Sequence, residues 1–294
     1  MNDGFLSSPS LPSPPGLHAS AADKRSVRQV MGMVLLALIP AVLTQIARIG
    51  IDLGVRLLLA IICALAVEAL ALYWRGRPLR PFLTDLSAPV AAVLFVLASP
   101  WAMPWWIACI GIIAALAVAK HVYGGLGDNP FNPAMFGCAL LLICFSPYLQ
   151  AVPVGSAATR SLPWVPMMYA LGGLFLLWKK VIRWQGPVAM LGGAVATQLL
   201  YPSLVEEAFK GADLVTVLSA PVVLAAFFIV TDPVTGCLST RGRIAFGAGA
   251  GALTVVFSRS GDAATGLPFA VLAMNCAASW IDRHTRPRRG SVPS

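Results

Sequence analysis

The sequence predicts an all-α integral membrane protein with ten transmembrane helices arranged as two inverted five-helix repeats. Three observations lead to this prediction. The 294 residues are 58% hydrophobic and only 11% charged, whereas a soluble domain is about one-quarter charged. Ten apolar segments follow one another, and Lys and Arg concentrate in alternate connections between them. A five-residue sequence also occurs twice, five segments apart.

The apolar segments are the candidate transmembrane helices. Several are shorter than the roughly 20 residues that cross a bilayer. A short or proline-interrupted segment is either a broken helix that ends near the membrane midplane or a helix that continues into its polar flanks. In chain order the segments are Val30–Ile46, Val55–Trp74, Leu86–Ser99, Trp105–Ala119, Ala134–Phe145, Trp164–Trp178, Pro187–Leu200, Leu214–Val230, Ile244–Phe257 and Leu267–Ile281.

The ends of the chain differ from its apolar middle. Residues 1–23 are rich in Ser and Pro and predict a disordered cytoplasmic tail. The cationic residues that follow precede a full-length membrane helix, which argues against a cleaved signal peptide. We divide the remainder into a first five-helix repeat (24–150), an outward-facing loop (151–163), a second five-helix repeat (164–282) and a basic cytoplasmic tail (283–294).

The basic residues predict the orientation. Sixteen of the 21 Lys and Arg residues lie on the side of the N-terminus, and the other five are Arg48, Arg56, Arg160, Lys210 and Arg259. Because positive residues favour the cytoplasmic side, both termini are expected in the cytoplasm. This bias also accounts for the net charge of +9. We expect no nucleic-acid partner, because no compact basic module with interleaved aromatic residues is present.

An internal repeat supports the helix count. Leu86–Val90 and Leu218–Val222 are both Leu-Ser-Ala-Pro-Val, and each copy opens an apolar run that closes on a proline. The two copies belong to the third and eighth segments. An odd number of spans between them inverts the second copy relative to the first, and such repeats usually hold their ligand at the interface between them.

The loop Gly124–Met135 (GGLGDNPFNPAM) is the strongest candidate for a ligand site. Its prolines prevent a regular helix, and its glycines let the backbone approach a ligand closely. Asp128, Asn129 and Asn132 supply polar side chains between two apolar segments. This pattern predicts a cofactor or ion site. The alternative is a rigid connector in which the two asparagines cap the next helix.

Two further carboxylates lie at or within apolar segments. Asp232, in Thr-Asp-Pro-Val-Thr, ends the eighth segment, where it would coordinate a cation or orient a cofactor amide; the alternative is a cap on a short loop helix. Glu68 lies inside the second segment, where a carboxylate is costly and is by default a functional candidate. Pairing with Arg75 or Arg77 would give Glu68 a structural role instead.

Other kinds of site are not indicated. The six cysteines form no C-x-x-C pair, and the three histidines are scattered, so neither a metal site nor a hydrolytic set of catalytic residues is expected. Any chemistry would therefore have to be supplied by a cofactor.

Several long motifs resemble a known family. Gly124–Met135, Phe227–Arg243 (FFIVTDPVTGCLSTRGR), Ala119–His121 and Ile281–Pro287 resemble the RnfD membrane subunits of the Rnf complex, an ion-translocating ferredoxin:NAD⁺ oxidoreductase. The chain is similar, more distantly, to the NqrB subunits of the sodium-pumping NADH:quinone reductase. The resemblance extends from about residue 24 to residue 288 and implies ten helices in two inverted repeats, akin to urea transporters.

The resemblance also implies two flavins. Family members carry FMN on a threonine, attached by a flavin transferase outside the cytoplasmic membrane, and that motif corresponds to Ser156–Thr159, with Thr159 as acceptor. Pro153 replaces a usual acidic residue, Arg160 replaces a common proline, and the loop is shorter, so a relative without covalent flavin is the alternative. A non-covalent riboflavin is expected near Asn129 and Asn132, with Asp128 and Asp232 as further candidates.

These implications predict a flavin-carrying subunit of a complex that couples ferredoxin/NAD⁺ electron transfer to ion pumping. We expect it in the lipid of the bacterial inner membrane, in contact with the other subunits of the complex. The electron-transfer subunit would not be a complete enzyme by itself. The alternatives are a flavin-free solute or ion channel on a urea-transporter-like scaffold and a purely structural membrane anchor.

Overall fold

The computed structural model describes residues 26–100, 103–146, 149, 164–200, 218–258 and 263–285, and these are helical with no strand among them. Each of the ten predicted apolar segments contains helix. The α-helices are α1 (Val27–Ile49), α2 (Ile51–Trp74), α3 (Leu79–Leu83), α4 (Ser87–Ala98), α5 (Trp105–Ile113), α6 (Pro133–Cys144), α8 (Trp164–Trp178), α9 (Gln185–Leu200), α12 (Ala220–Leu224), α13 (Thr240–Phe257) and α14 (Ala263–Thr285), and two π-helical stretches are η1 (Ala114–His121) and η2 (Ala225–Ile229).

The helices identify a multi-pass membrane protein. Val27–Ile49, Ile51–Trp74 and Leu79–Ala98 are each long and apolar enough to cross a bilayer. Shorter apolar helices in the described ranges are Trp105–His121, Pro133–Cys144, Trp164–Trp178 and Ala220–Ile229. Leucine and isoleucine side chains project outward from α1 and α2; Leu43 and Ile51, for example, are 60% and 73% exposed. Such a surface is compatible with lipid rather than with water.

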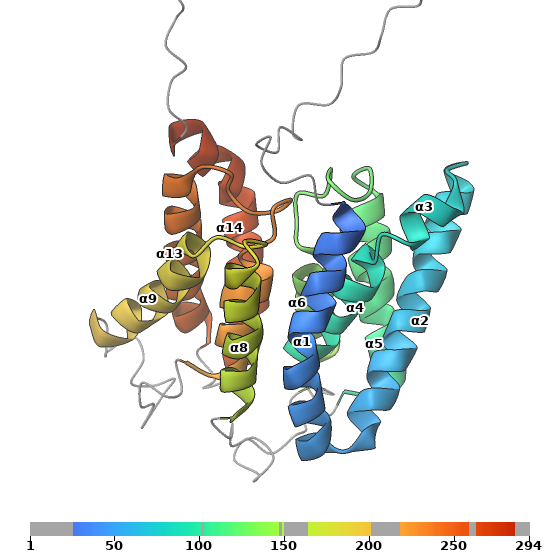
Figure 1. Cartoon of the computed structure of the whole chain (residues 1–294), viewed down its shortest axis with the longest axis horizontal. Helices are drawn as coiled ribbons and strands as arrows, with labels where there is room; N and C mark the ends of the chain where they lie inside the picture. Colours follow the sequence, from blue (N-terminus) through green and yellow to red (C-terminus); the bar gives the residue numbers. More distant parts are fainter. Residues whose placement is uncertain are drawn as a thin grey trace, which may run out of the picture.

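Two groups of helices lie side by side (Figure 1). Helices α1 to α6, coloured blue to green, form one group, and α8 to α14, coloured yellow to red, form the other. The groups meet where α1 packs against α8, α6 against α14, and α4 against α12. The start of α1 and the end of α14 lie at the same end of the bundle.

The repeated Leu-Ser-Ala-Pro-Val sequences begin the most deeply buried helices. In α4 every residue except Ala91 is buried, and all five residues of η2, which continues α12, are buried. Leu86 enters α4 with φ = 66°, and the Asp85 carboxylate accepts a hydrogen bond from the Ser87 amide at 2.7 Å. Because protein surrounds them, these helices can be shorter than a bilayer is thick.

Glycines bring several helices into close contact. A Cβ atom on Gly251 of α13 would lie 2.0 Å from the Met190 carbonyl oxygen of α9. A Cβ on Gly172 of α8 would lie 2.1 Å from the Ala37 carbonyl oxygen of α1. Gly192 of α9 makes no such contact, because a Cβ there would meet no atom within 4 Å.

Candidate functional site

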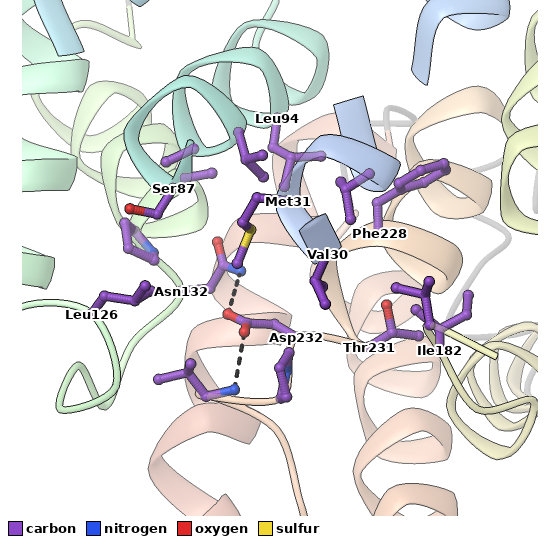
Figure 2. A pocket seen from close by; sticks show the side chains of 18 of the residues that line it. Val30, Met31, Ser87, Leu94, Leu126, Asn132, Ile182, Phe228, Thr231 and Asp232 are labelled. Carbon is purple, nitrogen blue, oxygen red and sulfur yellow. Dashed lines mark hydrogen bonds between the residues drawn. The ribbon is translucent and has the colours of Figure 1, made fainter. Parts of the chain in front are cut away.

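A cavity of about 140 Å³ lies between the two groups of helices. Apolar side chains from α1, α4 and η2 form most of its wall, including Met31, Leu94 and Phe228 (Figure 2). Asn129, Asn132 and Asp232 are among its polar lining residues. The structure thus brings together three of the predicted site residues, which come from two loops about one hundred positions apart.

The loop after η1 supplies two of these side chains and depends on glycine. Gly124, Gly125 and Gly127 have φ values of 133°, 109° and 102°, which other residues rarely adopt. The Gly124 and Gly125 amides donate to the last carbonyls of η1 at 3.2 and 3.0 Å. The glycines therefore let the chain turn sharply at the helix end and return toward the cavity.

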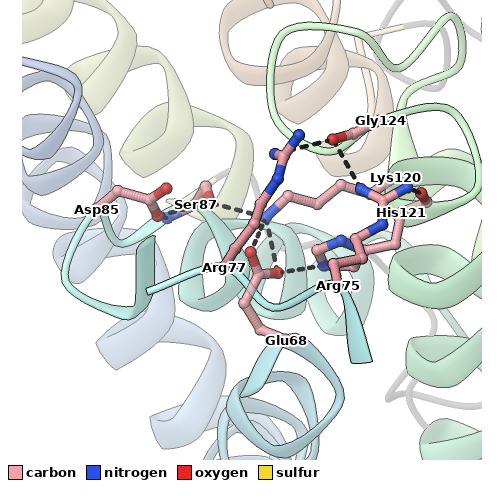
Figure 3. Close-up of polar contacts among 8 residues, drawn as sticks. All are labelled: Glu68, Arg75, Arg77, Asp85, Ser87, Lys120, His121 and Gly124. Carbon is pink, nitrogen blue, oxygen red and sulfur yellow. Dashed lines mark hydrogen bonds and ion pairs between the residues drawn. The ribbon is translucent and has the colours of Figure 1, made fainter. Parts of the chain in front are cut away.

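Two arginines hold this loop against the end of α2. Arg75 donates to the carbonyl oxygens of Gly124, at 2.8 Å, and of His121. Arg77 donates to the Gly124 carbonyl oxygen at 3.3 Å (Figure 3). The arginines predicted to pair with Glu68 therefore clamp the loop backbone instead.

Asn132 and Asn129 have different environments. Asn132 is the N-cap of α6, and its Oδ1 accepts from the Met135 amide at 3.2 Å. Asn129 Nδ2 donates to the Phe131 carbonyl oxygen at 3.1 Å, whereas the buried Asn129 Oδ1 finds no hydrogen-bond partner among the described residues. Capping therefore accounts for Asn132 but leaves a buried acceptor on Asn129 unexplained.

Asp232 lies next to Asn132, in the loop after η2. Its carboxylate accepts from the Val234 amide and the Thr235 hydroxyl, each at 3.0 Å, and from Asn132 Nδ2 at 3.5 Å (Figure 2). Burial raises the pKa of Asp232 above its ordinary value, and these hydrogen bonds act in the opposite direction. Asp232 stabilises a turn, and α13 starts only at Thr240.

Asn275 of α14 joins the loop that carries Asn132 to the loop that carries Asp232. It is not among the residues predicted from the sequence. Its Oδ1 accepts from the Asn132 amide at 3.0 Å, and its Nδ2 donates to the Thr235 carbonyl oxygen at 3.0 Å. The signal available in the sequence was an amide side chain within the apolar segment Leu267–Ile281. Such an amide requires hydrogen-bond partners once it is buried.

Asp128 differs from the other candidates. Its side chain is exposed, and it is outside the set of described residues that line the cavity. The carboxylate packs over Gly124, where an added Cβ would lie 2.7 Å from Asp128 Oδ2. Asp128 can therefore affect the site through the shape of the loop.

A buried charged cluster adjoins the cavity (Figure 3). Lys120 Nζ donates to both carboxylate oxygens of Glu68 and to Ser87 Oγ, each at 2.8 Å. His121 Nε2 lies 3.0 Å from Glu68 Oε2. The expected pairing of Glu68 with Arg75 or Arg77 is wrong; its partners come from η1, more than fifty residues away.

Some predicted features lie outside the described residues. Ser156 and Thr159 belong to this set, as do the 1–23 tail and the 151–163 loop. Among the residues that the structure does describe, no group of three or more His, Cys, Asp or Glu side chains could hold a metal ion.

Comparison of the sequence with known proteins shows which family the chain belongs to. The profile of the NQR2, RnfD, RnfE family matches residues 17–153 and 148–290. The chain is similar to proteins named as the D-type subunit of an ion-translocating oxidoreductase complex. The protein from Pseudomonas aeruginosa (strain LESB58) is 36% identical, over 95% of each chain.

Two further relatives with the same name give a similar result. The protein from Ectopseudomonas mendocina (strain ymp) is 38% identical, over 92% of this chain and 93% of its own. The protein from Vibrio cholerae serotype O1 is 34% identical, over 90% of this chain and 95% of its own. The chain therefore belongs to the NQR2, RnfD, RnfE family.

Proposed function

We propose that the chain is a flavin-carrying membrane subunit of an ion-translocating oxidoreductase complex. In this proposal the complex couples electron transfer between ferredoxin and NAD⁺ to ion pumping, and the other subunits are its partners. The names of the relatives support membership of such a complex. The observation that carries the flavin assignment is the cavity between the two groups of helices, which is lined by Asn129 with its unpaired side-chain oxygen.

The residues around the cavity fit a flavin ring. The ring is flat and largely apolar, and its polar edge has an N–H donor between two carbonyl acceptors. The cavity offers an apolar wall and side-chain amides from Asn129 and Asn132. An isoalloxazine N–H would satisfy the buried Asn129 Oδ1, which otherwise carries the cost of a lost hydrogen bond.

A bound flavin would supply the ability to accept and release single electrons. The residues of this chain would hold and orient it. Asn129 and Asn132 would fix the polar edge, while Phe228 and Leu94 would exclude water from the ring. Arg75 and Arg77 would keep the asparagine loop in place through their hydrogen bonds to its backbone.

The non-covalent site is tested by replacing both asparagines with Leu. We expect the Asn129→Leu/Asn132→Leu complex to lose most of its acid-extractable riboflavin, because the polar edge would lose its partners. The matched control is Gln198→Leu, the same amide-to-leucine change on α9 away from the cavity-lining set. Wild-type riboflavin content in the folded double variant would refute the site.

We also propose that Thr159 carries FMN through a phosphoester bond and that Ser156 contributes to recognition by a flavin transferase. Support comes from the Ser-Ala-Ala-Thr sequence and from Arg160, a charge partner for the phosphate. Thr159→Val removes the esterified oxygen and should abolish the in-gel fluorescence of this subunit, whereas Ser156→Ala should weaken it. A wild-type intact mass equal to the bare polypeptide, in a host with active transferase, would exclude covalent FMN.

The proposed topology is ten membrane helices in two inverted repeats, 24–150 and 164–282, with both termini in the cytoplasm of a bacterial inner membrane. The charge distribution and the repeated Leu-Ser-Ala-Pro-Val sequence support this arrangement. The start of α1 and the end of α14 lie at the same end of the bundle, which agrees with an even number of membrane crossings. In this orientation the cavity lies on the cytoplasmic half, and the 151–163 loop lies outside.

A further inference from the structure

The wall of the cavity carries an asymmetric pair of charges. Among the described residues that line it, Lys120 is the cationic one and Asp232 the anionic one. They come from different groups of helices. Asp232 is held by neutral donors, whereas Lys120 faces a full carboxylate. Their electrostatic effects on a ligand therefore do not simply cancel.

The Lys120 ammonium is fixed in orientation. An ammonium group has three donors, and all three have acceptors: two oxygens of Glu68 from α2 and the Ser87 hydroxyl from α4. Lys120 and Glu68 are each 2% exposed. His121, beside Lys120 on η1, contacts the same carboxylate.

The Lys120–Glu68 pair has its positive end nearer the cavity. Lys120 and Ser87 are lining residues of the cavity, whereas Glu68 is outside the described lining set and lies behind Lys120. In a site that excludes water, a fixed charge acts on a neighbour far more strongly than it does in solution. A ligand that gains an electron would therefore be stabilised by Lys120, and Glu68 would limit the effect.

We propose that Lys120 sets the electron affinity of the flavin in this cavity and that Glu68 reduces that effect by pairing with Lys120. The inference rests on the proposed non-covalent flavin site and adds to it two residues that need not touch the flavin's polar edge. Because the two residues carry opposite charges, removing one charge should shift the midpoint potential of the flavin in the opposite direction from removing the other. A merely structural role would not shift a midpoint potential in opposite directions.

The test is a redox titration of the intact purified complex, in which a one-electron chemical reductant is added and flavin absorbance is followed. The non-covalent flavin is identified as the component missing from the Asn129→Leu/Asn132→Leu complex. Glu68→Gln leaves the Lys120 charge uncompensated and should raise the midpoint potential. Lys120→Met removes the cation and should lower it. We expect each change to alter the ratio of oxidised to reduced flavin at least tenfold at a fixed potential, which is 59 mV for one electron.

Two more variants keep the test decisive. Lys120→Arg retains the positive charge and should leave the potential near the wild-type value. Lys120→Met leaves a buried carboxylate with one partner fewer and can fail to fold. In that case the Glu68→Gln/Lys120→Met double variant replaces it, and Glu68→Gln must have the higher potential of the two.

The outcomes separate this inference from the proposed function. Absence of non-covalent flavin from the wild-type complex would overturn both. Retained riboflavin with unchanged potentials, or with shifts of the same sign in Glu68→Gln and Lys120→Met, would overturn the role of Lys120 and leave the flavin site standing. Retained riboflavin with shifts of opposite sign supports the inference.

Discussion

At the scale of single residues, the two asparagines Asn129 and Asn132 differ in their hydrogen-bond partners. Asn132 caps α6 and contacts Asp232, so both ends of its side-chain amide have partners. Asn129 has a bonded nitrogen and an unpaired oxygen. Asn132 is therefore held by two protein partners, whereas Asn129 retains an acceptor with no partner among the described residues.

This difference predicts separable effects of alanine substitutions. Asn132→Ala should lower the unfolding free energy by about 0.5–2 kcal/mol, the usual cost of losing an N-cap. Asn129→Ala should change it by less than about 0.5 kcal/mol, because losing the Nδ2 bond to Phe131 is offset by removing the buried, unpaired Oδ1. It should nevertheless reduce riboflavin content. Thermal unfolding of the detergent-solubilised protein, with extractable flavin measured in parallel, checks both. The reverse order of stabilities would contradict the assignment.

At the residue scale, the sequence pointed to residues that line the cavity where the motif was local. The glycines, asparagines and Asp232 were recognised as candidates because their types and spacing are unusual between apolar segments. The partner of Glu68 was assigned wrongly, because nearby arginines were favoured over a lysine brought close only by folding. Asn275 was missed for the same reason, since its partners lie on two distant loops.

At the scale of elements, both π-helical stretches lead into the cavity. η1 ends at the Lys120–His121 pair, and η2 is followed by the Thr231–Asp232 turn. Wider π-type turns occur often at functional sites. The sequence predicts helix over both stretches but not this change of helix type, which depends on hydrogen bonds and packing around them. It also missed the five-residue α3, which is too short to have a periodic pattern.

The packing of α9 on α13 gives an element-scale prediction with an internal control. Gly251→Ala should lower the unfolding free energy by about 1–3 kcal/mol, a typical cost of overpacking, because its Cβ would meet the Met190 carbonyl at 2.0 Å. Gly192→Ala on α9 should raise it by about 0.5–1 kcal/mol, since the site is open and alanine favours helix. Midpoints of thermal unfolding for the two variants should therefore fall on opposite sides of the wild-type value.

At the scale of the whole molecule, the sequence predicted where helices occur better than how far each one extends. Every apolar segment contains helix, but α1 is longer than predicted, and α12 starts only at Ala220, inside the predicted Leu214–Val230 segment. Polar flanks of α1 continue its hydrogen-bonded turns. α12 instead starts after a non-helical Leu218 and Ser219, inside the apolar run. Hydropathy predicts neither the extension of α1 nor the position at which α12 starts.

The proposed orientation predicts which side of the membrane each loop faces. In a cysteine-free background, Gly211→Cys should react with an impermeant thiol reagent added outside intact cells. Arg241→Cys, which replaces an exposed side chain at the start of α13, should react only after lysis. These two positions flank an odd number of proposed crossings, so labelling of both from one side would exclude the inverted-repeat topology.

The arginine clamp on the glycine loop has a consequence for how the protein matures. Arg75 and Arg77 are exposed, and water can replace their bonds to the Gly124 carbonyl oxygen. Releasing them would free a segment that is already non-helical, so the loop that carries Asn129 would be able to move while the helices keep their own hydrogen bonds. Under the proposed flavin-carrying function, cofactor loading therefore need not precede insertion into the bilayer. Under the same proposal, the time for which the flavin stays in the cavity would depend on the hydrogen bonds of Arg75 and Arg77.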